Sequence, residues 1–419
     1  MVFLVQPLMR TRSGAWCQML MVDSCRMNVH CRRRRSQRQC ASRGSLQHVA
    51  KSAAAPHHLT CAGSDRILLT FNVTLKLSGR RFPVAAGETV LEAGQRAGVA
   101  LPYSCRAGVC GSCKATLLEG ECNYPRNPPV GLSANAIAHH AVLLCQAVPA
   151  SDLLLEAREV PSVAEMARRQ LDVVVAEKWR LAPDVIGLRL LPGPGERRLR
   201  RLPGQYLDVL LDDGRRRPFS IANGPQPDGA IELHVRHVAG GGFTSYVNDT
   251  LQVGDTLRID GPLGTFVPRE DSERPMLFMA GGTGFAPIKA IVEHFIALGT
   301  RRPMHLYWGA RSAADLYLRA LAERWAHDVH NLSFCAVVSD PDQAAGLRCG
   351  LVHEAVLADL PDLSGFDVYM SGPPEMVDAG RQWFVDAGAR ESRLYFDSFD
   401  YAPDVLAQII AARAGFSAV

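Results

Sequence analysis

The sequence lacks any apolar run close to the roughly 20 residues that a membrane-spanning helix needs. It also lacks a recognisable secretory signal and an internal repeat. These absences argue against a membrane protein, and against a secreted scaffold held together by its 12 cysteines. We therefore expect a protein of the reducing cytoplasm, and there we interpret clustered cysteines as metal ligands in preference to disulfides.

Charge divides the chain into two unequal parts. The net charge is +4, but residues 1–66 alone carry +9, because 11 Lys and Arg face only Asp23 and Asp65. The remaining residues carry −5, so the overall basic charge does not indicate nucleic-acid binding. At 419 residues the chain also exceeds the size of a single hydrophobic core, which predicts about two to four domains.

Residues 1–66 are predicted to form a basic, disordered extension, because they show neither helical nor strand periodicity. Three interpretations stay open: a transit peptide, a nucleic-acid-binding arm, or an over-long gene model whose true start lies near Leu68 or Leu69. We favour the last, because Cys17, Cys25, Cys31 and Cys40 show no organised spacing.

Beyond this extension the sequence pattern changes three times. Residues 69–160 combine a strand hairpin, a short helix and a cysteine-rich loop, and the polar stretch 161–171 is typical of a linker. Short strands separated by Gly, Pro and Asp follow over 172–270, which predicts an antiparallel barrel. From 274 to 401 strands alternate with helices, as in a parallel sheet covered on both faces. Residues 402–419 are a C-terminal tail with no assigned role.

The strongest motif is a set of four cysteines in the first of these segments. Their spacing is C-x4-C-x2-C, followed after 31 residues by a fourth cysteine, which is the plant-type ligand spacing for a 2Fe-2S cluster. The predicted ligands are Cys105, Cys110, Cys113 and Cys145. A zinc site is disfavoured, because zinc ribbons usually pair two C-x2-C motifs. We expect the fourth ligand to lie in a buried strand at 141–145.

A second motif, Arg217-Pro218-Phe219-Ser220, lies at the edge of a predicted barrel strand. A flavin needs a cation at its pyrophosphate, an aromatic or apolar wall for its ring, and a hydrogen-bond donor near its reactive nitrogen. This motif offers all three. The alternative is a solvated arginine run, since two further arginines precede it.

Glycines mark a further candidate phosphate-binding loop. Residues 240–245 are either a phosphate cradle or a flexible hairpin tip. The candidate ligands in this loop are Gly241, Gly242, Thr244 and Ser245. Arg236, on the strand before the loop, is either a second cation for the pyrophosphate or an ordinary surface charge.

In the third segment, the loop Gly281-Gly282-Thr283-Gly284 follows an apolar strand and opens a helix. The dipole and the free amides at such a helix N-terminus favour a nucleotide phosphate. The loop is not a G-x-G-x-x-G fingerprint, and it equally fits a structural turn. Gly372 and Pro373 follow a later strand, again at the carboxyl end where such sheets bind ligands.

These motifs together resemble those of NADH-dependent ferredoxin reductases with an N-terminal plant-type ferredoxin. Similar proteins include the reductase components of benzoate-type dioxygenases and of methane or phenol hydroxylases, and CDP-6-deoxy-3,4-glucoseen reductase-like proteins. The resemblance spans Phe71 to Tyr401. It implies a multidomain fold with a β-grasp 2Fe-2S ferredoxin domain, an antiparallel Greek-key FAD barrel and an α/β parallel-sheet NAD domain.

The resemblance also implies roles for single residues. Arg217 would bind the FAD phosphate, and Ser220 would lie near the flavin nitrogen that receives hydride. The loop Gly281–Gly284 would hold the nicotinamide nucleotide. Phe399, in the C-terminal aromatic motif 395–399, would lie beside the isoalloxazine, so Ser220 and Phe399 are the expected catalytic residues.

Two positions depart from the family pattern. Phe219 replaces the commoner Tyr of the flavin motif, which removes a hydroxyl but keeps the ring. Ser371 stands where many relatives have Cys before Gly-Pro-Pro, so a thiol role at the nicotinamide is in doubt.

The expected function is electron transfer from NADH through FAD and a 2Fe-2S cluster to a separate acceptor protein. NADH releases two electrons as hydride whereas the cluster accepts one, so a flavin must stand between them. The resemblance implies an oxygenase, hydroxylase or sugar dehydrase component as the acceptor. It also favours NADH over NADPH, although Arg311 offers a cation for a ribose phosphate. The alternative is a redox sensor or binding protein that uses the cluster as a signal. A self-contained oxygenase is disfavoured, because the sequence shows no further iron-binding motif.

Overall fold

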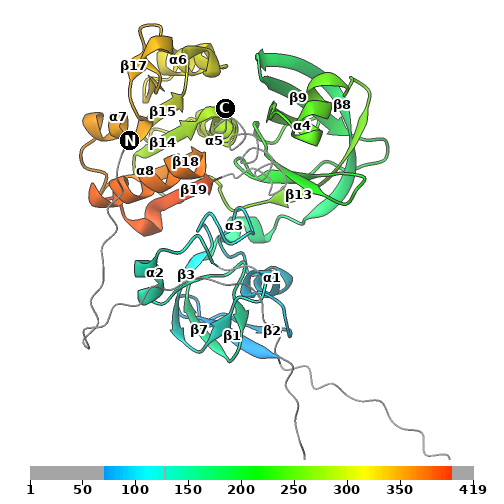
Figure 1. Ribbon diagram of the computed structural model, residues 1–419, viewed down its shortest axis with the longest axis vertical. Helices are drawn as coiled ribbons and strands as arrows, with labels where there is room; N and C mark the ends of the chain where they lie inside the picture. Colours follow the sequence, from blue (N-terminus) through cyan, green and yellow to red (C-terminus); the bar gives the residue numbers. More distant parts are fainter. Residues whose placement is uncertain (1–69, 127–128, 399–419) are drawn as a thin grey trace, which may run out of the picture. The chain divides into compact units, whose positions relative to one another are not determined.

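The computed structural model describes residues 70–126 and 129–398. The predicted extension, the predicted C-terminal tail and Phe399 lie outside these residues. The described residues form three large sheets, each with its own hydrophobic core, and one two-stranded sheet (Figure 1). Within them, no helix is long and apolar enough to cross a membrane.

The first sheet has the β-grasp arrangement that the sequence predicts. Its strand order is β2-β1-β7-β3-β5, with β1 parallel to β7 and the other neighbours antiparallel. The strands of this region are β1 (Phe71–Leu75), β2 (Arg81–Val84), β3 (Lys114–Glu119), β4 (Cys122–Asn123), β5 (Ala141–Leu143), β6 (Val148–Pro149) and β7 (Leu153–Glu156). Helix α1 (Val90–Arg96) covers the sheet and starts at a capping box formed by Thr89 and Glu92. Two shorter helices are α2 (Ala134–Ala138) and α3 (Pro161–Ala164).

The second sheet is an antiparallel barrel of six strands. Its order is β11-β10-β13-β8-β9-β12, and a bridge between Ile221 and Leu233 joins its two ends. Neighbours in this order are mostly not consecutive in the chain, as in a Greek key. The strands are β8 (Arg169–Ala182), β9 (Val185–Pro192), β10 (Tyr206–Leu210), β11 (Arg216–Ser220), β12 (Ile231–Arg236) and β13 (Thr256–Leu263), and helix α4 (Gly242–Asp249) follows β12.

The third sheet is wholly parallel, with the order β17-β16-β15-β14-β18-β19. Its strands are β14 (Met276–Gly281), β15 (Met304–Ala310), β16 (Leu332–Val338), β17 (Arg348–Cys349), β18 (Asp367–Gly372) and β19 (Leu394–Ser398). Helices α5 (Phe285–Ala297) and α6 (Arg319–Asp328) pack into one core, and helices α7 (Val352–Asp359) and α8 (Pro374–Asp386) pack into another. Helices therefore cover both faces of this sheet (Figure 1), as the alternating pattern predicts.

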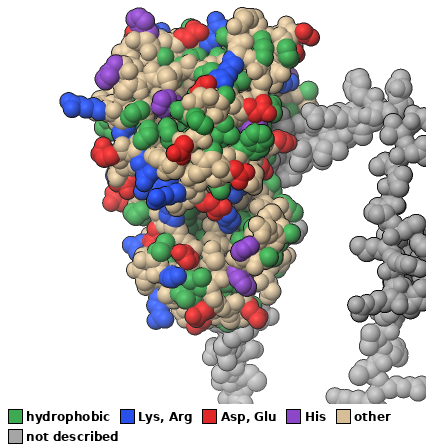
Figure 2. Space-filling model, turned by 90° about the vertical axis from the view of Figure 1, so that its left-hand side faces the viewer, with side chains coloured by type: hydrophobic (Ala, Val, Ile, Leu, Met, Phe, Trp, Pro, Cys, Tyr) green, Lys and Arg blue, Asp and Glu red, His purple; other side chains and the backbone are tan. Residues whose placement is uncertain are grey.

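Charges of both signs are mixed on the surface. On the face shown in Figure 2, Lys and Arg side chains lie among Asp, Glu and apolar side chains. That face therefore carries no broad field of one sign.

Three details differ from the sequence-based expectation. Strand β5 ends at Leu143, so Cys145 lies in a turn and not in the strand. The segment 240–245 is not a hairpin tip, because helix α4 begins at Gly242. The predicted linker 161–171 contains helix α3. It also contains the first residues of β8, because this strand begins at Arg169, before its first buried apolar residue.

Candidate redox site

The cysteine-rich loop between α1 and β3 is bent by residues with positive φ angles. Arg106 (57°), Gly108 (80°) and Gly111 (75°) adopt this conformation. As a result, the amides of Ala107 and Cys110 both donate to the Sγ of Cys105 at 3.4 Å. Amides directed at a sulfur stabilise the thiolate that an iron requires.

The four predicted thiol ligands lie as two pairs. A hydrogen bond from Cys110 lowers the pKa of Cys105 to about 6, and a hydrogen bond from Cys113 lowers the pKa of Cys145. The same bonds and burial raise the pKa of both donors. Each pair therefore has one thiol that ionises easily, held next to a second sulfur.

This arrangement fits a 2Fe-2S cluster. Two thiol pairs match two irons that each take two thiolates. The donor set is all sulfur and already receives amide hydrogen bonds. Bound there, the cluster would accept one electron at a time.

The predicted flavin motif lies on β11. The Phe219 ring lies 5.5 Å from the Phe243 ring, so the two form an aromatic wall. The hydroxyl of Ser220 donates to Asp397 at 3.1 Å. Arg217 directs one guanidinium nitrogen to the carbonyl of Arg216 at 3.1 Å.

Arg236 is the last residue of β12, and the segment 240–245 follows it closely in the chain. One guanidinium nitrogen of Arg236 contacts Asp184 at 2.9 Å and Asp315 at 3.5 Å, while the other, Nη2, is buried without a hydrogen-bond partner. A buried orphan donor fits an anionic ligand such as a pyrophosphate. A side chain added at Gly242 would meet no atom within 4 Å, so the backbone there is open to close approach.

The hydroxyls of the same loop already have partners. Thr244 bonds to the backbone of Val238 and Gly241, and Ser245 lies 3.1 Å from His237 Nε2. The predicted role of these two side chains in phosphate binding therefore requires them to bridge between the loop and the ligand.

The predicted nucleotide loop is Gly281-Gly282-Thr283-Gly284, and its glycines are needed for different structural reasons. A Cβ at Gly281 would lie 2.5 Å from the sulfur of Met376, and a Cβ at Gly284 would lie 2.1 Å from the carbonyl oxygen of Ser371. These two glycines allow the loop to pack against β18 and α8. Gly282 takes a positive φ of 53°, and a Cβ added there would have only the unpartnered Arg236 Nη2 within 4 Å, at 3.9 Å. It is therefore the glycine best placed to expose its backbone to a ligand; Thr283 follows it.

Gly372 and Pro373 close the other side of this loop. A Cβ at Gly372 would lie 3.0 Å from the Cα of Gly281, and a Cβ at Gly281 would lie 2.9 Å from Pro373 Cδ. Both residues thus pack against the loop directly. The Ser371 hydroxyl next to this loop is buried and has no hydrogen-bond partner.

Asp397 is a candidate functional residue that the sequence reasoning did not assign. Its carboxylate accepts from Ser220 of the flavin motif at 3.1 Å and from Ser104 at 2.5 Å, and Ser104 directly precedes the predicted ligand Cys105. Burial raises the pKa of Asp397 although both hydroxyls oppose that shift. Its position in the aromatic motif 395–399, two residues before Phe399, is the sequence feature that could have identified it.

Comparison with known proteins assigns each sheet. Family models match for the 2Fe-2S iron-sulfur cluster binding domain at residues 73–150, the oxidoreductase FAD-binding domain at 172–267 and the oxidoreductase NAD-binding domain at 278–382. The CDP-6-deoxy-L-threo-D-glycero-4-hexulose-3-dehydrase reductase of Yersinia pestis is 37% identical over 333 residues, which cover 79% of this chain and 99% of that protein. The chain belongs to the ferredoxin-type flavin reductases.

Other members of this reductase family are similar over the same length. Reductase component 2 of the terephthalate 1,2-dioxygenase of a Comamonas species is 36% identical, over 77% of this chain and 95% of its own. The crystal structure of the Amycolatopsis cytochrome P450 reductase GcoB matches with a TM-score of 0.63 and 35% identity, covering 79% of this chain and 99% of that one. The predicted family, fold class and cofactors (2Fe-2S cluster, FAD and nicotinamide nucleotide) are thereby confirmed for this reductase.

Proposed function

We propose that this reductase takes hydride from NADH and delivers electrons singly, through FAD and the cluster on the Cys105, Cys110, Cys113 and Cys145 thiolates, to a separate acceptor protein. When bound, FAD supplies the conversion from a two-electron donor to a one-electron carrier. The protein's own residues bind, orient and shield these groups. The observation that carries the proposal is the contact of Asp397 with both the flavin motif and the cluster loop.

Several residues hold the cofactors in this proposal. Arg217 and Arg236 bind the FAD pyrophosphate with the loop that contains Gly241, Gly242, Thr244 and Ser245, and Pro218 and Phe219 form the wall of the flavin site. Ser220 lies near the reactive flavin nitrogen, and Asp397 orients its hydroxyl by accepting the hydroxyl proton, which leaves the Ser220 oxygen as a hydrogen-bond acceptor there. The free Nη2 of Arg236 and the open approach to Gly242 support this assignment. Phe399, outside the described residues, is proposed as the second catalytic residue.

The cluster loop is held against the barrel by polar contacts. Arg106 donates to Asp208 at 2.7 Å, and the Tyr206 hydroxyl donates to the carbonyl of Ser104 at 2.8 Å. Both partners lie on β10, beside the strand that carries the flavin motif. This arrangement supports direct electron transfer from the flavin to the cluster.

NADH is the proposed donor because of a hollow of about 600 Å³ at the carboxyl ends of β15 and β16. Its lining includes three carboxylates, Asp184, Asp315 and Asp340, and one guanidinium, Arg311, which lies 3.7 Å from Asp315. Arg236 pairs with Asp184 and Asp315, so Asp340 supplies the excess negative charge that disfavours the extra phosphate of NADPH. Gly281–Gly284, Gly372 and Pro373 then hold the rest of the nucleotide.

The acceptor is proposed to be an oxygenase, a hydroxylase or a CDP-6-deoxy-hexose dehydrase component, because relatives of each kind are about equally similar. We place the protein in the cytoplasm, where thiolate ligands stay reduced. The test is a turnover assay with NADH, the purified holoprotein and each candidate acceptor. One of the three should turn over at a rate that depends on the reductase concentration. Turnover of NADH that stops after one equivalent with every acceptor, artificial ones included, would instead favour a redox sensor.

A further inference from the structure

Strand β12 presents two chemically different faces. Ile231, Leu233 and Val235 point into the barrel core. By the two-residue period of a strand, Glu232, His234 and Arg236 lie on the opposite face. Each of these three contacts a residue of the NAD-binding domain. The outer face of β12 is therefore a polar surface against that domain.

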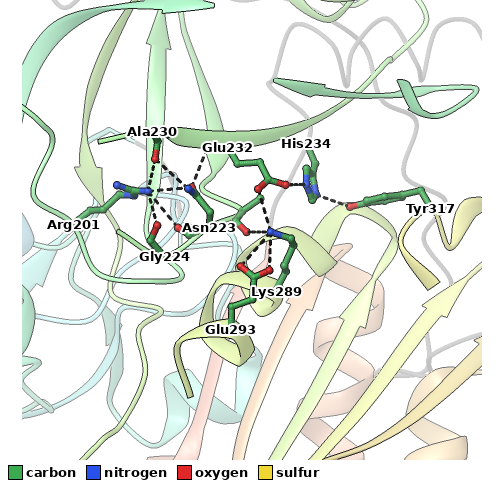
Figure 3. A network of polar contacts seen from close by, with 10 residues as sticks. Arg201, Asn223, Gly224, Ala230, Glu232, His234, Lys289, Glu293 and Tyr317 are labelled. Carbon is green, nitrogen blue, oxygen red and sulfur yellow. Dashed lines mark hydrogen bonds and ion pairs between the residues drawn. The ribbon is translucent and has the colours of Figure 1, made fainter. Parts of the chain in front are cut away.

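Lys289 of α5 makes the first contact. Its ammonium is nearly buried and lies 3.1 Å from Glu232 and 3.2 Å from Glu293 (Figure 3). It also lies 3.1 Å from the carbonyl of Ala222. Three acceptors satisfy the three donors of an ammonium group. The helix that follows the nucleotide loop is thus attached to the barrel at a fixed position.

His234 makes the second contact, and its protonation state follows from its neighbours. Burial lowers the pKa of His234, so the imidazole is neutral. Burial alone would raise the pKa of Glu232, but His234 and Lys289 hold it below its usual value, so this carboxylate is ionised. The proton must therefore be on Nε2, 2.8 Å from Glu232, and Nδ1 must accept from the Tyr317 hydroxyl at 3.1 Å (Figure 3).

Tyr317 carries this contact on to the nucleotide loop. Its ring meets the Trp308 ring edge-on at 5.2 Å, and Trp308 stacks on Phe285 at 3.8 Å. The indole N–H of Trp308 donates to the carbonyl of Gly282 at 3.0 Å. A continuous set of contacts thus joins His234 of the barrel to the loop that is proposed to hold the nicotinamide nucleotide.

We propose that the outer face of β12 is a latch that fixes the NAD-binding domain on the FAD barrel, and that His234 is a positioning residue for hydride transfer. Hydrogen bonds are directional, so this surface sets one register, whereas an apolar surface would tolerate sliding. Hydride transfer needs the nicotinamide close to its reactive position, and a misplacement of about 1 Å can cost about a hundredfold in rate, so the rate depends on that register. The inference rests on the proposed hydride transfer from NADH to FAD.

The experiment is anaerobic stopped-flow reduction of the bound FAD by NADH in the full-length holoprotein. His234→Leu removes both hydrogen bonds and should slow flavin reduction by about tenfold or more. His234→Gln keeps one donor and one acceptor and should restore most of the rate. Tyr317→Phe keeps the ring but loses the hydroxyl, and should give an intermediate rate. His305→Gln, a change of the same kind on β15 outside this network, should behave like the wild type.

Two further measurements separate positioning from loss of structure. FAD and iron contents should be unchanged in all variants, and dithionite-reduced variants should reduce cytochrome c at the wild-type rate. A wild-type rate of flavin reduction in His234→Leu, equal slowing in His234→Gln, or loss of FAD in both would overturn the inference. Absence of flavin reduction in the wild type itself would instead contradict the proposed function.

Discussion

The Ser104 hydroxyl donates a hydrogen bond of 2.5 Å to Asp397, a residue 293 positions later in the chain. Since Asp397 also accepts from Ser220, a single carboxylate contacts the residue before the first cluster ligand and the last residue of the flavin motif. Its two partners can be removed one at a time, which separates the two halves of the electron path.

Ser104→Ala should slow the reduction of cytochrome c by NADH several-fold and leave the reduction of ferricyanide nearly unchanged, because only the cluster side of Asp397 is lost. Ser220→Ala should slow both reactions, since the flavin side comes first in the path. Steady-state assays with the two acceptors measure this difference. Identical profiles for the two variants would mean that Asp397 does not divide the path in this way.

Cys110→Ser removes one of the two sulfurs of the first thiol pair. The variant should lose the cluster absorbance and the reduction of cytochrome c, while NADH-dependent ferricyanide reduction by the flavin stays largely intact. Cys349→Ser, at an exposed thiol of β17, is the matched control and should change neither reaction. Loss of ferricyanide reduction in Cys110→Ser would show that the domains do not function as modules.

The sequence predicts the local features of this site better than its long-range contacts. The cysteine spacing and the strand–loop–helix order are local patterns, and each predicts its sheet correctly. The Asp397 contacts join residues 177 and 293 positions apart. Hydrophobic periodicity in the sequence predicts local elements and does not predict contacts between such distant residues. The turn at Cys145 and the helix after Gly241 were missed for a related reason, because burial in the tertiary structure decides where β5 ends and α4 begins.

Asp340 lines the proposed coenzyme hollow with two other carboxylates. Wild-type protein should therefore use NADH at least about tenfold better than NADPH, as kcat/KM. Asp340→Ser should raise kcat/KM for NADPH and leave the value for NADH within about twofold, because it removes one negative charge near the ribose. Asp342→Asn removes an equal charge from an exposed residue that does not line the hollow, and it should leave the preference unchanged.

His234 gives the latch a pH dependence with a definite sign. Its folded-state pKa lies below the unfolded value near 6.5, because burial disfavours the imidazolium. The unfolded chain therefore binds more protons as the pH falls below about 6.5, and stability is lost in that window. Glu232, Lys289 and Tyr317 face this ring. Thermal release of FAD, followed by fluorescence from pH 7.5 to 5.5, should show a smaller loss of stability in His234→Gln than in the wild type; parallel curves would contradict the assignment.

The central claim is that electrons from NADH reach a cluster held by the two thiol pairs through a flavin on the barrel. The most direct test adds NADH to the anaerobic holoprotein and follows flavin absorbance and electron paramagnetic resonance together. We predict bleaching of the flavin followed by the paramagnetic signal of a reduced 2Fe-2S cluster. A protein isolated without flavin or iron-sulfide absorbance, or a flavin that bleaches while no cluster signal develops, would contradict the account.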